Sequence, residues 1–217
     1  MSPSFSLVDA LAVHDLQTYL GRAGRVEDGS VRLTAAGGVL AVYTAVLYPH
    51  GLLDQTPTVL GLRTFETDPA ASFDAVVPTR SLLDRLGRAD PAAIRLPLEV
   101  STVTWAGISP PRGGWAQVGE TDASLLTRMA ADGIAAVART IPEGTGEQLV
   151  WRVRGSVWGA PIEELYDVPA GIAFAADSLG FLGGEERVPV FEAGTWTRLS
   201  LTRGHVLVKR AAWSRHG

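Results

Sequence analysis

The chain has 217 residues, a formal charge of −4 and no cysteine. The lack of cysteine excludes thiolate catalysis, disulfide bonds, iron–sulfur clusters and cysteine-ligated zinc. Hydrophobic residues make up 46% of the chain and charged residues 19%, as in an ordinary globular protein with a core. A single lysine and no asparagine, beside abundant Ala, Gly, Arg and Pro, indicate a GC-rich bacterial genome.

Charge is divided unevenly along the sequence. Residues 193–217 carry five basic and no acidic side chains, which leaves a formal charge of −9 for residues 1–192. This asymmetry predicts either an anionic partner for the C-terminal segment or an ionic contact between that segment and acidic residues of the same chain.

No targeting or membrane segment is predicted. The N-terminal residues lack the basic and apolar regions of a secretory signal. The longest uncharged stretch, 33–53, contains only ten consecutive strongly apolar residues, too few to span a bilayer. We therefore expect a soluble, cytoplasmic protein with no membrane partner.

The first half of the sequence predicts an N-terminal helix followed by a mostly antiparallel sheet. A helix over 7–23, with Ser6 as its N-cap, has an apolar face. The residues of that face are Val8, Leu11, Ala12, Leu16, Tyr19 and Ala23. Strands are predicted at 31–34, 39–48, 58–66, 73–77 and 98–105, with a glycine turn in the first hairpin and a short helix over 80–86.

The second half predicts a helix-rich region that ends in a β-hairpin. The Pro- and Gly-rich segment 107–115 is the best linker candidate. Helices follow from Thr121 to Pro142, over 146–158 and over 169–179, although the residues 150–154 also alternate like a strand. Strands at 195–202 and 205–210 close the chain. We predict an α+β fold with a sheet domain over 1–106 and a helix-rich region over 116–217, or one continuous domain.

No sequence motif identifies a catalytic centre. There is no Gly-Lys pair for a phosphate-binding P-loop. His14, His50, His205 and His216 have no metal-ligand spacing. The sequence therefore predicts no metal site, no cofactor and no identifiable catalytic residue.

Two aromatic and basic clusters stand outside the predicted core. In the helix 146–158, Trp151, Arg154 and Trp158 share one side, which favours a cation–π stack, a recognition surface or a partly buried face. In and beside the linker, Trp105, Arg112 and Trp115 have the composition of a ligand or partner loop.

The C-terminal hairpin is the main candidate site. A two-residue turn at Arg203-Gly204 would place Arg198 opposite Lys209, a repulsion that an anion between them would relieve. We predict that Trp196, Arg198, His205 and Lys209 bind an anion on the outer face. Leu199, Leu201, Val206 and Val208 would face the core. The alternative is a contact with acidic residues of this chain, namely Glu163, Glu164, Glu185 or Glu186.

These observations favour a non-catalytic binding or assembly protein. Six tryptophans and a positive mean hydropathy predict a homo-oligomer, most simply a homodimer. The expected partner is an anionic ligand or an acidic protein, and the acidic overall charge makes nucleic acid an unexpected partner. A small-molecule enzyme without a sequence-local motif is the main alternative, followed by a regulatory nucleic-acid binder that uses the basic tail.

Overall fold

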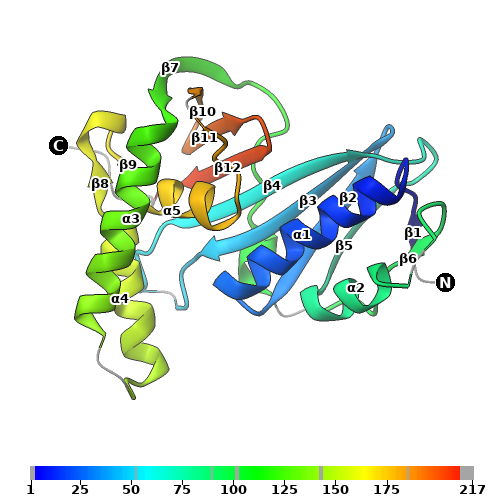
Figure 1. The fold of residues 1–217 in the computed structure, drawn as a ribbon, viewed down its shortest axis with the longest axis horizontal. Helices are drawn as coiled ribbons and strands as arrows, with labels where there is room; N and C mark the ends of the chain where they lie inside the picture. Colours follow the sequence, from blue (N-terminus) through cyan, green and yellow to red (C-terminus); the bar gives the residue numbers. More distant parts are fainter. Residues whose placement is uncertain are drawn as a thin grey trace. The chain divides into compact units, whose positions relative to one another are not determined.

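The computed structural model describes residues 3–51, 53–88, 90–100, 103–141, 144–184 and 186–210. The fold is α+β: helices accompany a large antiparallel sheet, and the described chain ends in strands (Figure 1). The chain divides into two compact units. The first unit comprises Met1–Ala45 and Leu62–Ser109, and the second comprises Val46–Gly61 and Pro110–Gly217. The domain borders that the sequence suggests, with the linker 107–115, stay a prediction.

The first unit places two helices on one face of a four-stranded arrangement (Figure 1). The strands follow the order β5-β2-β3-β4, and residues 46–47 of β3 and 58–61 of β4 belong to the second unit. Their bounds are β2 (Ser30–Ala36), β3 (Val39–Leu47), β4 (Thr58–Glu66) and β5 (Phe73–Pro78). The helices are α1 (Ala10–Val26) and α2 (Thr79–Leu86), and β1 (Ser4–Phe5) pairs with β6 (Ile94–Arg95).

The first hairpin confirms the sequence prediction. Gly37 and Gly38 have φ angles of +58° and +82°, which residues with a Cβ rarely adopt, so these glycines permit the tight turn between β2 and β3. Tyr19 of α1 is buried against β3, and its hydroxyl lies 2.8 Å from Thr44 Oγ1. Burial raises the pKa of the Tyr19 phenol, which keeps it neutral.

The apolar face predicted for the N-terminal helix is partly wrong. The helix begins at Ala10, and Asp9 rather than Ser6 is the N-cap: its carboxylate accepts a hydrogen bond of 2.8 Å from Ala12 N. Val8 therefore precedes the helix, and it is 64% exposed, while Leu11 is 77% exposed. The buried residues of α1 are Val13, Leu16, Tyr19, Leu20 and Ala23, whose spacings of three and four define one helix face.

The strand predicted over 98–105 is also wrong. Residues 101 and 102 lie outside the described part of the chain, and 98–100 are in no helix or strand. A 3₁₀ helix, η1 (Thr104–Gly107), follows, and it buries Trp105 and Ala106. Trp105 therefore reaches the core from a short helical turn rather than from an alternating strand, and Leu98 at the start of the predicted strand is exposed.

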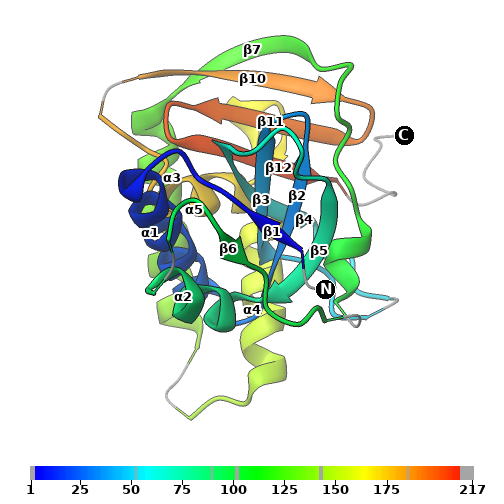
Figure 2. The same cartoon turned by 90° about the vertical axis from the view of Figure 1, so that its right-hand side faces the viewer.

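The second unit combines three helices with four strands in the order β12-β11-β10-β7, which Figure 2 shows side by side. The strands are β7 (Ala116–Asp122), β10 (Arg187–Ala193), β11 (Trp196–Leu201) and β12 (Gly204–Lys209). The helices are α3 (Ala123–Thr140), α4 (Glu147–Gly159) and α5 (Gly171–Ser178). The short strands β8 (Pro161–Ile162) and β9 (Val168–Pro169) flank η2 (Glu163–Leu165). Helix α3 packs against both α4 and α5, and α5 packs against β12.

The sequence predicted the three helices but missed the strands β7 and β10 and the short strands β8 and β9. The helix expected from Thr121 begins two residues later, because β7 continues to Asp122, and Pro142 lies outside the described residues. Residues 150–154 are helical, so the alternative of a strand there is wrong. Helix α5 is almost fully buried, as its apolar sequence predicted.

The C-terminal hairpin forms with a register two residues away from the predicted one. Its turn lies at Thr202-Arg203, so Leu201 pairs with Gly204 and Arg198 pairs with Leu207, not with Lys209. The predicted like-charge pair is therefore wrong, and Lys209 lies opposite Trp196. Because a shift of two preserves the alternation, the face assignment survives. The predicted core residues Leu199, Leu201, Val206 and Val208 are buried.

Candidate functional site

Arg198 lies between two aromatic rings on the face of β10 and β11. Its guanidinium carbon is 4.7 Å from the ring centroid of Trp115 and 4.5 Å from that of Phe191. Phe191 reaches this position because it is the register partner of Arg198 on the adjacent strand. Both distances lie within the range of cation–π attraction. The two rings therefore hold the guanidinium carbon of Arg198 from two neighbouring elements.

The linker segment supplies one of these rings. Trp115 directly precedes β7, and its indole Nε1 donates a hydrogen bond of 3.1 Å to the carbonyl of Pro111. The structure thus brings Trp115 of the predicted loop together with Arg198 of the predicted hairpin site. Arg112 is exposed, and Trp105 is buried in the first unit. Sequence analysis treated the loop and the hairpin as separate, because nothing in the sequence relates two segments about 80 positions apart.

His205 and Lys209 lie on the same face of the hairpin as Arg198. Alternation along β12 places Leu207 between them, and Leu207 is the register partner of Arg198. The His205 ring Nδ1 is 3.1 Å from Ser200 Oγ. Burial, together with the charge of Arg198, lowers the pKa of His205. Trp196 is buried on this face and is therefore a packing residue beneath Lys209 rather than an open contact surface.

The charges on this face are unequally balanced. Arg187 of β10 donates to Asp122 at 2.9 Å and to Glu120 at 3.3 Å, both on β7. By contrast, no ion pair joins Arg198 or Lys209 to a carboxylate within the described residues. Arg198 Nε is buried and has no hydrogen-bond partner there. Desolvation lowers the pKa of Arg198, as expected for a cation that lacks an ionic partner.

The alternative of an ionic contact within the chain is found for one basic residue of the C-terminal segment, because Arg210 pairs with Glu192 at 3.0 Å. It is not found for Arg198 or Lys209 among the residues that the structure describes. Glu186 accepts a hydrogen bond from the hydroxyl of Thr202 in the turn, not from Arg198. Glu163 and Glu164 form no ion pair with Arg198 or Lys209 in the described ranges, and Glu185 lies outside them. The neighbours of Arg198 are the aromatic rings of Trp115 and Phe191, and not the acidic side chains that the sequence suggested.

The tryptophan cluster of α4 forms two separate stacks. Trp158 is buried and stacks on Phe174 of α5, with ring centroids 4.3 Å apart. Trp151 stacks on His50, with centroids 4.1 Å apart and planes 5° from parallel. Arg154 donates to the carbonyl of Val46 at 3.4 Å. Of the three interpretations that the sequence left open, this arrangement fits a partly buried helix face.

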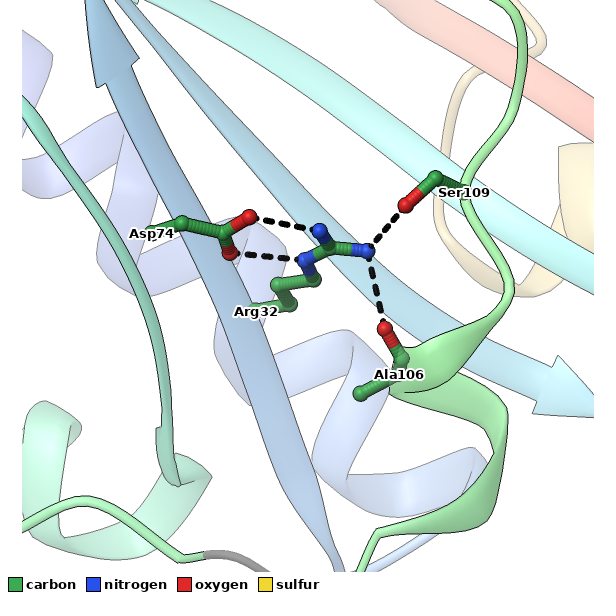
Figure 3. Close-up of polar contacts among 4 residues, drawn as sticks. All are labelled: Arg32, Asp74, Ala106 and Ser109. Carbon is green, nitrogen blue, oxygen red and sulfur yellow. Dashed lines mark hydrogen bonds and ion pairs between the residues drawn. The ribbon is translucent and has the colours of Figure 1, made fainter.

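An arginine network in the first unit was missed by the sequence analysis. Arg32 of β2 forms a bidentate ion pair with Asp74 of β5, through Nε at 2.8 Å and Nη2 at 2.6 Å (Figure 3). Its Nη1 donates to the Ala106 carbonyl at 2.8 Å and to Ser109 Oγ at 2.7 Å. The network ties the segment after η1 to the sheet, which is a structural role. The sequence offered one signal for this network: Arg32 and Asp74 carry opposite charges and lie on the strands β2 and β5, which pair with each other.

Comparisons with known proteins relate the chain to two family models and to one group of solved structures. Residues 1–107 match a model described as "Domain of unknown function (DUF8010)", and residues 110–213 match one described as "Domain of unknown function (DUF8185)". No curated protein matches the sequence. Among solved structures, the β subunit of Caulobacter crescentus DNA polymerase III has a TM-score of 0.54 at 13% identity, over 99% of this chain and 66% of that chain.

Two further structures have the same relation to the chain. The DNA polymerase III β subunit of Thermotoga maritima gives a TM-score of 0.53 at 12% identity, over 99% of this chain. The sliding clamp of Bartonella birtlesii, solved with griselimycin, gives 0.53 at 15% identity, over 98% of this chain. The chain has the fold of bacterial sliding clamps. It spans 66% of the length of each of these clamp chains.

The clamp fold bears on the predicted partners. The expectation that nucleic acid is not a partner loses its support, because the solved structures with this fold are subunits of a DNA polymerase. Within the described ranges, no helix is long and apolar enough to cross a membrane. In the same residues, no cluster of His, Asp or Glu side chains could hold a metal ion.

Proposed function

We propose that the chain is a non-catalytic binding protein that self-associates and holds an anionic partner on the face of β11 and β12. The observation that carries the proposal is the charge imbalance on this face. Arg187 is neutralised by Glu120 and Asp122, whereas Arg198 and Lys209 have no carboxylate partner within the described residues. An anion beside Arg198 and Lys209 would supply the ionic partner that these two cations lack among the described residues.

The clamp fold supports a binding role and indicates which anion to test first. Clamp chains of this fold are DNA polymerase subunits, so the phosphate groups of nucleic acid are the first candidate. The aromatic rings of Trp115 and Phe191 hold the Arg198 side chain in place, which reduces the entropy lost when it binds an anion.

The experiment compares Arg198→Met with Arg187→Ala. Methionine retains the apolar stem between the two rings, while Arg187 is a matched cation on the same face whose charge is already paired. Binding of single-stranded and duplex oligonucleotides and of a polyglutamate peptide is measured at several salt concentrations. We expect Arg198→Met to weaken binding. If the ligand is a nucleic acid, the slope of the logarithm of the binding constant against the logarithm of salt concentration should fall in magnitude by about 1.

Arg187→Ala is the control, and it should bind like the wild type. The proposal is wrong if none of these anions binds the wild-type protein at low salt. It is also wrong if Arg187→Ala weakens binding as much as Arg198→Met. A large loss of melting temperature in Arg198→Met without any loss of binding would show that Arg198 only stabilises the fold.

A further inference from the structure

A cavity lies within the second unit, between α4 and residues that precede β4, namely His50 and residues 54–57. Its volume is about 780 Å³, within the range of small-molecule binding sites. It is lined by His50, Asp54, Gln55, Thr56, Pro57, Gln148, Trp151, Arg152, Gly155, Ser156, Gly159 and Ala160. None of these residues belongs to the face of β11 and β12, so the cavity is independent of the site proposed above.

One wall of the cavity is fixed by a carboxylate that bonds its own loop. Asp54 Oδ2 accepts from the backbone N of His50 at 2.8 Å. Asp54 Oδ1 accepts from the backbone N of Thr56 at 2.9 Å and from Thr56 Oγ1 at 2.6 Å. Burial raises the pKa of Asp54, but these hydrogen bonds outweigh it and hold the pKa below its usual value. The carboxylate of Asp54 therefore accepts hydrogen bonds from its own loop.

The opposite wall is α4, which lies close to the loop because of a glycine. A Cβ on Gly155 would lie 2.6 Å from Thr56 Oγ1, so a larger residue would push the two walls apart. The stack of Trp151 on His50 joins the walls at one end of the cavity. The cavity therefore exists in a fixed form before any ligand binds, which favours affinity.

Four polar residues at the open side of the cavity are exposed, and their side chains have no partner among the described residues. Gln148, Arg152 and Ser156 follow one another at i, i+4 and i+8 on one side of α4, and Gln55 lies in the facing loop. None of them has a hydrogen bond or an ion pair within the described ranges. The cavity thus offers one unpaired cation, two amides and one hydroxyl, while its only carboxylate is already bonded.

We propose that this cavity binds a small organic anion. Arg152 pairs with a phosphate or carboxylate group of the ligand, since its planar guanidinium matches both in a bidentate way. Gln55, Gln148 and Ser156 bond the neutral polar groups of the same molecule. A neutral or cationic ligand would leave Arg152 unpaired.

Isothermal titration calorimetry tests the proposal with four probes: ribose 5-phosphate, adenosine monophosphate, citrate and inorganic phosphate. The first two carry a phosphate and the third carries carboxylates, so the response distinguishes the two kinds of anion. We expect at least one organic anion to bind and Arg152→Gln to weaken it about tenfold, as for the loss of one charge-assisted bidentate pair. The matched control is Arg139→Gln, which removes an exposed arginine from α3.

Two-dimensional NMR of the tryptophan indole groups shows whether the probe binds in this cavity, because Trp151 lines it. The Trp151 signal should shift with the binding probe at similar concentrations in the wild type, in Arg139→Gln and in Arg198→Met, and only at about tenfold higher concentration in Arg152→Gln. The inference is overturned if no organic probe binds at about 10 mM, a concentration that would detect even very weak sites. It is equally overturned if only inorganic phosphate binds or if Arg152→Gln binds as the wild type does.

Discussion

His205 is the residue at which the candidate site becomes sensitive to pH. Burial lowers its pKa, and the nearby positive charge of Arg198 lowers it further. The folded protein therefore holds His205 neutral at a pH at which an unfolded chain, with an ordinary histidine pKa of about 6.5, begins to bind a proton. The unfolded state binds more protons in this window, so His205 makes the fold less stable as the pH falls below about 6.5.

The contribution of burial to the lowered pKa of His205 can be separated from that of the Arg198 charge. In an NMR titration the pKa of His205 should lie below its usual value in the wild type. In Arg198→Met, the charge is lost but most of the burial remains, so the pKa should rise part of the way back. An unchanged pKa of His205 in Arg198→Met would contradict the assigned role of the charge.

Among the single elements, helix α3 contains Gly133, although glycine is unfavourable inside a helix. A Cβ on Gly133 would lie 2.1 Å from the Trp158 ring. That ring cannot move away easily, because it is buried and stacked on Phe174. Gly133 therefore permits the close packing of α3 on α4. By contrast, a Cβ on Gly21 of α1 would meet no atom within 4 Å.

The two glycines should respond to alanine in opposite directions. Gly21→Ala should stabilise the fold by about 0.5–1 kcal/mol, since alanine restricts the unfolded chain and suits a helix. Gly133→Ala should destabilise it by about 1–3 kcal/mol, as expected for overpacking of a filled core. Urea denaturation of both variants and the wild type measures the difference. A stabilised Gly133→Ala would show that α3 and α4 are not packed as the structure has them.

The elements that could be predicted from the sequence are those with a strong local signal. Gly37-Gly38 marked the first hairpin, and the apolar runs of α3 and α5 marked helices. Strand β7 was missed because most of its residues are exposed at the edge of the sheet, so it lacks apolar alternation. The hairpin register was wrong because Arg203-Gly204 resembled a turn, whereas the turn begins one residue earlier.

The sequence predicted the hairpin residues of the candidate site but not the aromatic rings beside them. Alternation along β11 and β12 was enough to place Arg198, His205 and Lys209 on one face. The rings of Trp115 and Phe191 come from other elements, and only the antiparallel order of β7, β10 and β11 brings them near Arg198. Likewise, Arg152 and Gln55 meet in one cavity through tertiary packing, which leaves no pattern in the sequence.

Across the whole molecule, tryptophan does not supply a surface for self-association. The sequence has six tryptophans, but none of the five within the described ranges is exposed. The most exposed large apolar side chains are aliphatic instead: Val8, just before α1, with Leu11 and Leu98 in the first unit, and Leu53 in the second unit. Val8 and Leu11 form an exposed pair within four positions of each other, which favours an interface there.

We therefore predict that a Val8→Ser/Leu11→Ser double variant dissociates the oligomer without unfolding the chain. Both side chains are mostly exposed, so their loss should change the free energy of unfolding by no more than about 0.5 kcal/mol. Light scattering should give a multiple of the 23.0 kDa chain mass for the wild type and a mass nearer 23.0 kDa for the variant. Leu53→Ser is the matched control, because it removes the most exposed leucine away from α1. A wild-type mass of one chain at high micromolar concentration would remove the oligomer altogether, whereas dissociation by Leu53→Ser alone would place the interface in the second unit.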